Sequence, residues 1–277
     1  MLPNLHRARW RIIHHEPARG AWNMAIDEAI LEGVQRRESP PTLRLYAWEP
    51  ACLSLGFAQT VKDVNLDALH SHGWEMVRRL TGGRAILHTD ELTYSVIGPT
   101  EEPRLVGGVI ESYQRLSKAM LHALELLSLP VIHQGPNGHH SRMENNPVCF
   151  EVPSDYEITL GGKKLVGSAQ ARRKGGVLQH GSLPLHGDIA RITQTLQFES
   201  EAKRNEAADR VRAHAATVEE GLKRRVDWDE AAAAFAQGFA ETLNIEFVAG
   251  DLTTDEITTA ERLDAERYAH ERWTERV

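Results

Sequence analysis

The chain has 277 residues, of which 41% are hydrophobic and 26% are charged, so it can form one large domain or two smaller ones with a sizeable core. Its net charge of −7 argues against a general nucleic-acid binder, and no apolar run approaches the ~18 residues of a membrane span. Residues 1–15 lack the apolar core of a signal peptide. We therefore expect a cytoplasmic protein that binds neither nucleic acid nor membrane.

The first half of the chain mixes strand and helix patterns. The apolar spacing predicts a strand over 9–14, a helix over 21–37, strands over 42–48 and 52–57, a short helix over 65–72, and strands over 75–79 and 92–97. Gly107-Gly108 precede a long helix that continues to residue 127. The segment 133–147 is rich in Gly, Asn and Pro, which predicts a long loop, and such loops are often functional.

The second half begins with a hairpin signal over 156–168, in which Gly161-Gly162 form the turn. A strand is expected over 177–183. Helices are expected over 188–198, 200–220, 228–243 and 254–273, with a short strand over 245–248. Together these elements indicate an α+β domain with a helical tail.

Cys149, at the exit of the long loop, is the first candidate for chemistry. A free cysteine titrates near ~8.5, and only its thiolate is a good nucleophile. An ammonium group such as that of Lys164 would favour the thiolate and stabilise an oxyanion, as acyl transfer through a thioester requires. Most free cysteines are buried and inert, and that interpretation suits Cys52, which lies in an apolar strand.

Two glycine-containing segments could surround a ligand. Gly82-Gly83 lie between Arg79 and Arg84 and would let the backbone approach an acidic group, although a plain turn with surface arginines is the simpler interpretation. The spacing from Gly162 to Gly167 resembles a P-loop, but Ser168 stands where that motif requires lysine, so a P-loop is rejected. Small residues there could line a slot for an apolar ligand.

Histidines and basic residues give weaker signals. His180 could act as acid or base for Cys149, although a lone histidine in a strand is more often structural. The histidine pairs at 14–15 and 139–140 point to opposite faces of a strand, and no spacing matches a zinc site, so we predict no metal. Basic clusters at 78–84, 163–164 and 172–174 would form a rim for acidic partners if the fold brings them together.

Several of these segments occur in the order seen in the lipoate–protein ligase A and octanoyltransferase family, and the chain resembles it over 9–185. The segments are NMAIDE (23–28), WEP (48–50), GFAQ (56–59), RLTGGRAILH (79–88), GKKLVGSAQ (162–170) and QHGS (179–182). The family shares its fold with biotin–protein ligases. The resemblance implies mixed, largely antiparallel sheets flanked by helices, with a catalytic domain over 9–248 and a helical C-terminal extension over 249–277.

Two details favour one branch of the family. Cys149-Phe150 precedes Lys164, and Arg84 stands where ATP-dependent ligases commonly carry a third glycine. Both resemble the octanoyl-acyl carrier protein:protein N-octanoyltransferases. In these enzymes the cysteine accepts the octanoyl group from the carrier and passes it to a lysine of a lipoyl-domain protein, typically the glycine cleavage H protein. The resemblance implies no ATP, metal or other cofactor, and we expect a monomer.

The resemblance assigns Cys149 and Lys164 to catalysis and places the octanoyl chain in an apolar tunnel. It assigns substrate binding to Arg79, Thr81, Gly82, Gly83, Arg84, His88, Gly167, Ser168, Ala169, Gln170, His180 and Gly181. Three alternatives remain: an ATP-dependent lipoate–protein ligase acting through an acyl-adenylate, a hydrolase using Cys149 and His180, and an acyl- or carrier-binding module without catalysis.

Overall fold

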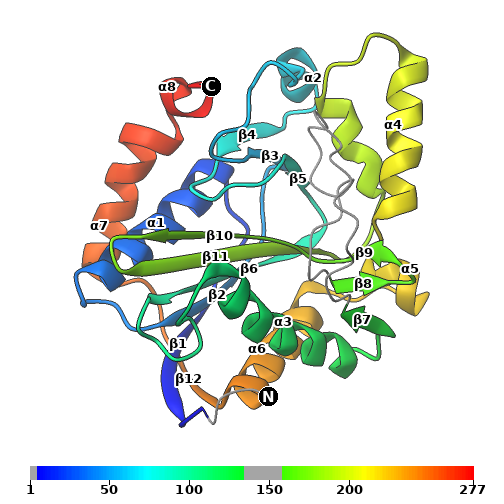
Figure 1. The fold of residues 1–277 in the computed structure, drawn as a ribbon. Coiled ribbons are helices and arrows are strands. Elements are labelled where there is room, and N and C mark those ends of the chain that lie inside the picture. Colours follow the sequence, from blue (N-terminus) through cyan, green and yellow to red (C-terminus); the bar gives the residue numbers. More distant parts are fainter. Residues whose placement is uncertain (1–4, 134–157) are drawn as a thin grey trace.

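The computed structural model describes residues 5–133 and 158–277. A six-stranded sheet in the order β10-β11-β6-β2-β1-β12 runs through the middle of the molecule (Figure 1). β1 is parallel to β2 and β12, whereas the other neighbours are antiparallel, which confirms a mixed, largely antiparallel sheet. Its strands are β1 (Ala8–His14), β2 (Thr42–Tyr46), β6 (Glu91–Pro99), β10 (Gly167–Arg173), β11 (Gly176–Pro184) and β12 (Ile245–Ala249).

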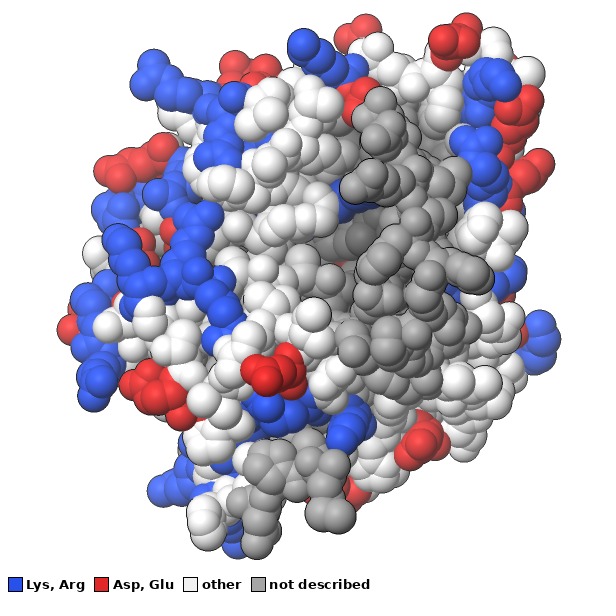
Figure 2. Space-filling model, in the orientation of Figure 1, with Lys and Arg blue, Asp and Glu red and all other residues white. Residues whose placement is uncertain are grey.

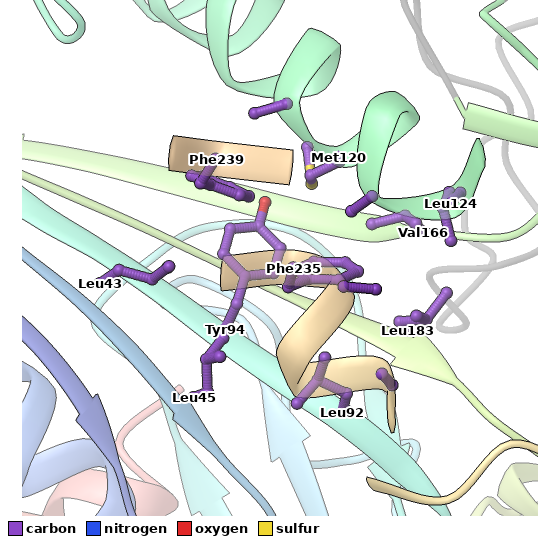
Figure 3. Close-up of a cluster of buried hydrophobic side chains, with 14 of the residues drawn as sticks. Leu43, Leu45, Leu92, Tyr94, Met120, Leu124, Val166, Leu183, Phe235 and Phe239 are labelled. Atoms are coloured by element: carbon purple, nitrogen blue, oxygen red, sulfur yellow. The ribbon is translucent and has the colours of Figure 1, made fainter. Parts of the chain in front are cut away.

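Two long helices cover one face of this sheet. α3 (Val109–Leu126) and α6 (Trp228–Leu243) pack against each other, and apolar residues of the strands point toward them (Figure 3). Phe235 and Phe239 of α6 lie beside Tyr94 of β6, with ring centroids 5.9 and 6.1 Å away. Burial of each such side chain stabilises the fold by roughly 1.5–3 kcal/mol. This core therefore holds α3 and α6 against one face of the large sheet.

The opposite face carries α1 (Gly20–Gln35), which is buried along almost its whole length. It can be apolar on most sides because α7 (Thr254–Leu263) packs on its outer side. The expected helix over 254–273 is instead divided into α7, a π-helical turn (Asp264–Tyr268) and α8 (Glu271–Thr274). The π-turn directs Tyr268 into the core, where its hydroxyl donates to Glu28 at 2.7 Å. The boundary between a catalytic domain over 9–248 and a C-terminal extension over 249–277 stays a prediction.

A smaller sheet of order β4-β3-β5 faces the side of the large sheet that α1 covers. It consists of β3 (Cys52–Leu55), β4 (Glu75–Arg78) and β5 (Ile86–His88). α2 (Leu66–Ser71), a 3₁₀-helix (Ile189–Thr195) and α4 (Glu201–His214) pack around it, and α5 (Val218–Leu222) follows. The predicted helix over 188–198 was thus too long. β5 was not predicted, because three residues after a glycine-rich turn give no usable pattern.

The predicted hairpin over 156–168 is only partly correct. β8 (Ile158–Leu160) and β9 (Lys163–Lys164) pair across the glycine turn, and β7 (Val131–His133) completes a third small sheet. The return strand ends after two residues because Leu165 and Val166 enter the core under α3. The chain then continues as β10 in the large sheet, so the segment expected to form one strand joins two sheets.

Candidate functional site

A cavity lies between the large sheet and the sheet β4-β3-β5. Met24 of α1 and Tyr46 of β2 lie on one side, and Ser54, Ile86 and His88 of the small sheet lie on the other. The cavity is therefore built from segments that are far apart in the chain.

Most of the predicted substrate-binding residues meet at this cavity. The segment 79–84, β5, β10 and β11 supply Arg79, Gly83, His88, Gly167, Ser168, Ala169, His180 and Gly181 to its lining. Thr81 lies just behind the wall, where it contacts His180. The side chain of Gln170 points to the other face of the sheet and bonds to Ser112 and Gln179.

Two glycines allow the close backbone packing that shapes the cavity. A Cβ on Gly56 would lie 1.9 Å from the carbonyl oxygen of Gly83, and a Cβ on Gly181 would lie 2.5 Å from that of Gly167. Neither position accepts a side chain without a backbone shift, because contacts below 3.0 Å are not tolerated. Gly83 also has φ +93°, a conformation that favours glycine.

The first polar network behind the wall centres on Asp27 of α1, which is 1% exposed. Its carboxylate accepts hydrogen bonds from Arg44 Nη1 at 2.8 Å, Ser95 Oγ at 2.7 Å and His180 Nδ1 at 3.2 Å. Burial alone would raise the pKa of Asp27, but the His180 contact and the Arg44 charge hold the pKa below its usual value. Asp27 is therefore the counter-ion of the buried Arg44.

This network fixes the role of His180. Because its Nδ1–H donates to the Asp27 carboxylate, its Nε2 accepts from the hydroxyl of Thr81 at 2.7 Å. Burial lowers the pKa of His180, so the ring is neutral at pH 7. Both ring nitrogens are thus engaged, which favours the structural interpretation of this histidine over the acid–base one.

A second polar network lies at the small sheet. His88 Nδ1 donates to Glu91 Oε1 at 2.7 Å, and His88 Nε2 accepts from Ser54 Oγ at 2.7 Å. The ring of His88 stacks on that of Trp48, with centroids 4.0 Å apart. Burial would raise the pKa of Glu91, but His88 and two hydroxyls hold it below its usual value. Arg79 joins this network through Ser54 Oγ at 3.0 Å.

The hydroxyl groups in the wall direct their protons away from the cavity. Thr93 and Ser182 both donate to Glu91, and Thr93 Oγ1 accepts from Trp48 Nε1 at 2.7 Å. Arg79 donates to the carbonyls of Gly82 and Arg84 as well as to Ser54. The wall is polar in composition, yet its polar groups bond to one another. The cavity therefore suits an uncharged alkyl chain.

Lys164 lies on the short strand β9 and is 7% exposed, and it is not itself a lining residue of the cavity. Its carbonyl accepts from Ala216 N at 3.0 Å, and its backbone pairs with Ala215. Ala215 packs against Ile86, which lines the cavity. Two residues, Leu165 and Val166, separate Lys164 from Gly167 in the wall. Cys149 lies outside the described residues.

The expected basic rim is wrong for its first cluster. Arg78 and Arg79 are 0% and 4% exposed, and their guanidinium groups donate hydrogen bonds to backbone carbonyl oxygens. Arg78, for example, donates to Gly56 and to Thr274 at the far end of the chain. Arg79 therefore stabilises the glycine-rich segment, Arg78 stabilises residues 56–59, and both guanidinium groups are buried.

The family model of the lipoyl protein ligase A/B catalytic domain matches residues 19–240, which span the cavity and both polar networks. The chain belongs to this family. It is 40% identical to octanoyltransferase LipM of Brevibacillus brevis, over 97% of this chain and 99% of the relative. It is 44% identical to octanoyltransferase LipM of Moorella thermoacetica, over 89% of this chain and 91% of the relative. These relatives confirm the predicted acyltransferase and octanoyl transfer.

Solved structures support the fold assignment within the family. A bipartite lipoate protein ligase from Thermoplasma acidophilum superimposes with a TM-score of 0.81 at 26% identity, covering 98% of this chain and 97% of that one. The predicted ligase-like fold is thereby confirmed. In residues 5–133 and 158–277, no helix is long and apolar enough to cross a membrane.

Sequence reasoning missed the carboxylates of the two networks. Asp27 lies within the segment 23–28, which carried part of the family resemblance, but nothing in that segment indicated its partners. Glu91 begins a strand after His88, and a single acidic residue there resembles an ordinary strand end. Only the antiparallel pairing of β6 with β11 brings Glu91 to Ser182.

Proposed function

We propose that this family member transfers the octanoyl group of octanoyl-acyl carrier protein to a lysine of a lipoyl-domain protein, with Cys149 as the thioester intermediate. We propose the glycine cleavage H protein as the acceptor. The observation that supports this best is the cavity wall, whose polar groups are paired with one another and leave carbon atoms toward the ligand. Such a wall accommodates a saturated acyl chain without unpaired polar groups.

The proposed reaction consists of two acyl-transfer steps. The Cys149 thiolate attacks the carbonyl carbon of the carrier thioester, and the carrier thiolate leaves and takes a proton. The acceptor amine then attacks the Cys149 thioester, forms an amide, and releases the Cys149 thiolate and a proton. The first step exchanges one thioester for another, whereas the second is driven by amide formation.

Lys164 is proposed to favour the Cys149 thiolate and to stabilise the oxyanions of both steps. Its support is positional: it is buried, and it leads directly into the strand that forms the cavity wall. A buried lysine next to a reaction site acts in a medium where its charge is weakly screened. Residues on β10 and β11 would hold the chain while Lys164 acts at its carboxyl end.

The main alternative is an ATP-dependent ligase in which Lys164 contacts an acyl-adenylate and Cys149 is incidental. Intact-protein mass separates the two after mixing with octanoyl-carrier protein in the absence of ATP. The proposal expects one octanoyl adduct, located on Cys149 by peptide mapping. An unmodified Cys149, with activity appearing only after ATP is added, would refute the transferase proposal.

Variants test the two roles separately. Cys149→Ser should abolish transfer, and Lys164→Ala should slow acylation and shift its pH profile to higher pH. Lys163→Ala is the matched control, because Lys163 lies next in sequence, is more exposed, and approaches Glu220 at 3.7 Å. Free octanoate is measured alongside, because its release in place of acylated acceptor would indicate a hydrolase. Saturable binding with no adduct would indicate a binding module.

A further inference from the structure

A group of arginines and aromatic rings lies at the tip of the β10–β11 hairpin. We name it the arginine–aromatic patch, and it consists of Phe57, Arg173, Lys174, Arg267, Trp273 and Arg276. Figure 2 shows the blue side chains that gather at the hairpin tip and the C-terminal helices, separated by uncharged surface from the centre of this face. The patch is thus a concentrated positive surface on a protein of net charge −7.

The rings hold the guanidinium groups in place. The guanidinium carbon of Arg276 lies 3.8 Å from the ring centroid of Phe57 and 4.2 Å from that of Trp273, and that of Arg173 lies 4.8 Å from Phe57. Arg276 also donates to the carbonyl of Phe57 at 2.7 Å. Stacked arginines keep their hydrogen-bonding edges open to a partner and lose little entropy on binding.

The charges of the patch are not neutralised within the described part of the chain. There, Arg173, Lys174 and Arg276 have no carboxylate within salt-bridge distance, whereas Arg267 pairs with Glu28. Burial and the nearby charges of Arg173 and Arg267 lower the pKa of Arg276. Like charges are crowded here, so an anionic partner would relieve their repulsion.

The patch is connected to the cavity by two short paths. Phe57 N donates to the carbonyl of Thr81 at 2.9 Å, which ties the patch to the glycine-rich segment. β10 runs from Ala169 in the cavity wall to Arg173 in the patch, and four residues of strand span about 13 Å. A partner seated on the patch therefore reaches the cavity with a short flexible arm.

We propose that the arginine–aromatic patch docks the donor, an acidic carrier protein that bears its acyl group on a phosphate-containing thioester arm. This inference rests on the proposed function. Acidic side chains and the phosphate both match a surface of preorganised arginines. The arm would enter the cavity acyl end first, past Gly83, while the carrier stays on the patch.

The charge of the acceptor argues against its use of the same surface. The acceptor must deliver a lysine amine, which as an ammonium is repelled by the patch. A separate groove of about 630 Å³ shares Trp48 with the cavity and has acidic residues in its lining, among them Glu49, Asp90, Asp227 and Asp229. The positive surface is therefore assigned to the donor, and the acceptor lysine is expected to approach from the side of the acidic groove.

The test reverses charge on the patch and, separately, elsewhere. Arg173→Glu/Arg276→Glu changes the net charge by the same amount as Arg7→Glu/Arg225→Glu, whose arginine side chains are 70% and 72% exposed and lie away from the patch. Binding of octanoyl-carrier protein to each enzyme is measured by calorimetry. Acylation is measured by mass with two donors, octanoyl-carrier protein and octanoyl-pantetheine, and unfolding temperatures show whether each variant folds.

We expect the patch variant to weaken carrier binding and raise the KM for octanoyl-carrier protein by about tenfold or more, with less dependence on salt. Its rate with octanoyl-pantetheine and the transfer from preloaded enzyme to the lipoyl domain should equal those of the wild type. Unchanged carrier binding, an equal loss in the control variant, or a loss confined to the acceptor step would overturn the docking proposal. Failure of wild-type enzyme to form any adduct would instead refute the proposed function, while calorimetry would still test the patch.

Discussion

Asp27→Asn is expected to destabilise the fold strongly while it preserves the shape of the side chain. Arg44 is 0% exposed, and Asp27 Oδ1 lies 2.8 Å from its Nη1. Without that charge, the guanidinium group keeps only neutral partners, chiefly Asn23 and His15. Breaking a buried pair by removing one partner costs about 3–5 kcal/mol in the free energy of unfolding. The loss is measured by urea unfolding at neutral pH.

Two further variants make the test specific. Asp209→Asn removes the charge of an exposed pair with Arg212 at 3.2 Å and should cost at most about 1 kcal/mol. Arg44→Met added to Asp27→Asn removes the uncompensated charge, so the double variant should recover much of the lost stability. A loss below about 1 kcal/mol for Asp27→Asn, or strictly additive losses in the double variant, would refute the assignment of Asp27 as the counter-ion.

Three other predictions follow from the site. Because burial lowers the pKa of His180 from 6.5, the unfolded chain binds a proton there that the folded chain does not. The stability that neutral His180 contributes should therefore be fully present above about pH 6.5 and decline below it, and the contribution of Asp27, whose pKa is lowered from 3.8, should be lost at still lower pH. Burial also lowers the pKa of His15 to about 4, so His180→Asn should reduce the first decline in melting temperature without removing it. Gly56→Ala should displace the peptide of Gly83 and slow acylation by roughly 10–100-fold, with unchanged acylation contradicting the packing argument. Burial raises the pKa of Cys52 well above 9.0, so thiol reagents should spare it in the folded enzyme, and Cys52→Ala should still form the octanoyl adduct.

The fold could be predicted largely because its helices and longer strands carry regular apolar patterns. The predicted helix over 228–243 coincides with α6, whose buried alanines and phenylalanines recur at helical spacing. Patterns failed where structure depends on distant partners. The π-turn before Tyr268 exists because that hydroxyl reaches Glu28, and no local spacing encodes such a contact.

The glycines that shape the site could be predicted from the sequence, but the hydrogen-bond partners of its polar side chains could not. Glycines at 83 and 181 are visible as motif residues, and both prove to line the cavity. For Arg79 the sequence offered an acidic ligand group or a place on the surface of a plain turn, and it did not indicate the hydrogen bonds that Arg79 donates to Ser54 and to its own loop. Burial decides between these roles, and burial depends on the packing of the small sheet over the large one.

The pairing of Arg11 with Glu256 has a consequence for synthesis of the protein on the ribosome. Arg11 lies on β1, the first strand of the large sheet to emerge, and is 8% exposed. It donates to both carboxylate oxygens of Glu256, which lies 245 residues later in the chain. At 5–20 residues per second, roughly 12–50 s separate the emergence of the two residues. During that interval β1 also lacks the hydrogen-bonded pairing with β12, its parallel neighbour. In the nascent chain β1 can therefore pair with β2 early, but its other edge and the Arg11 side chain lack their native partners until the C-terminal segment is made.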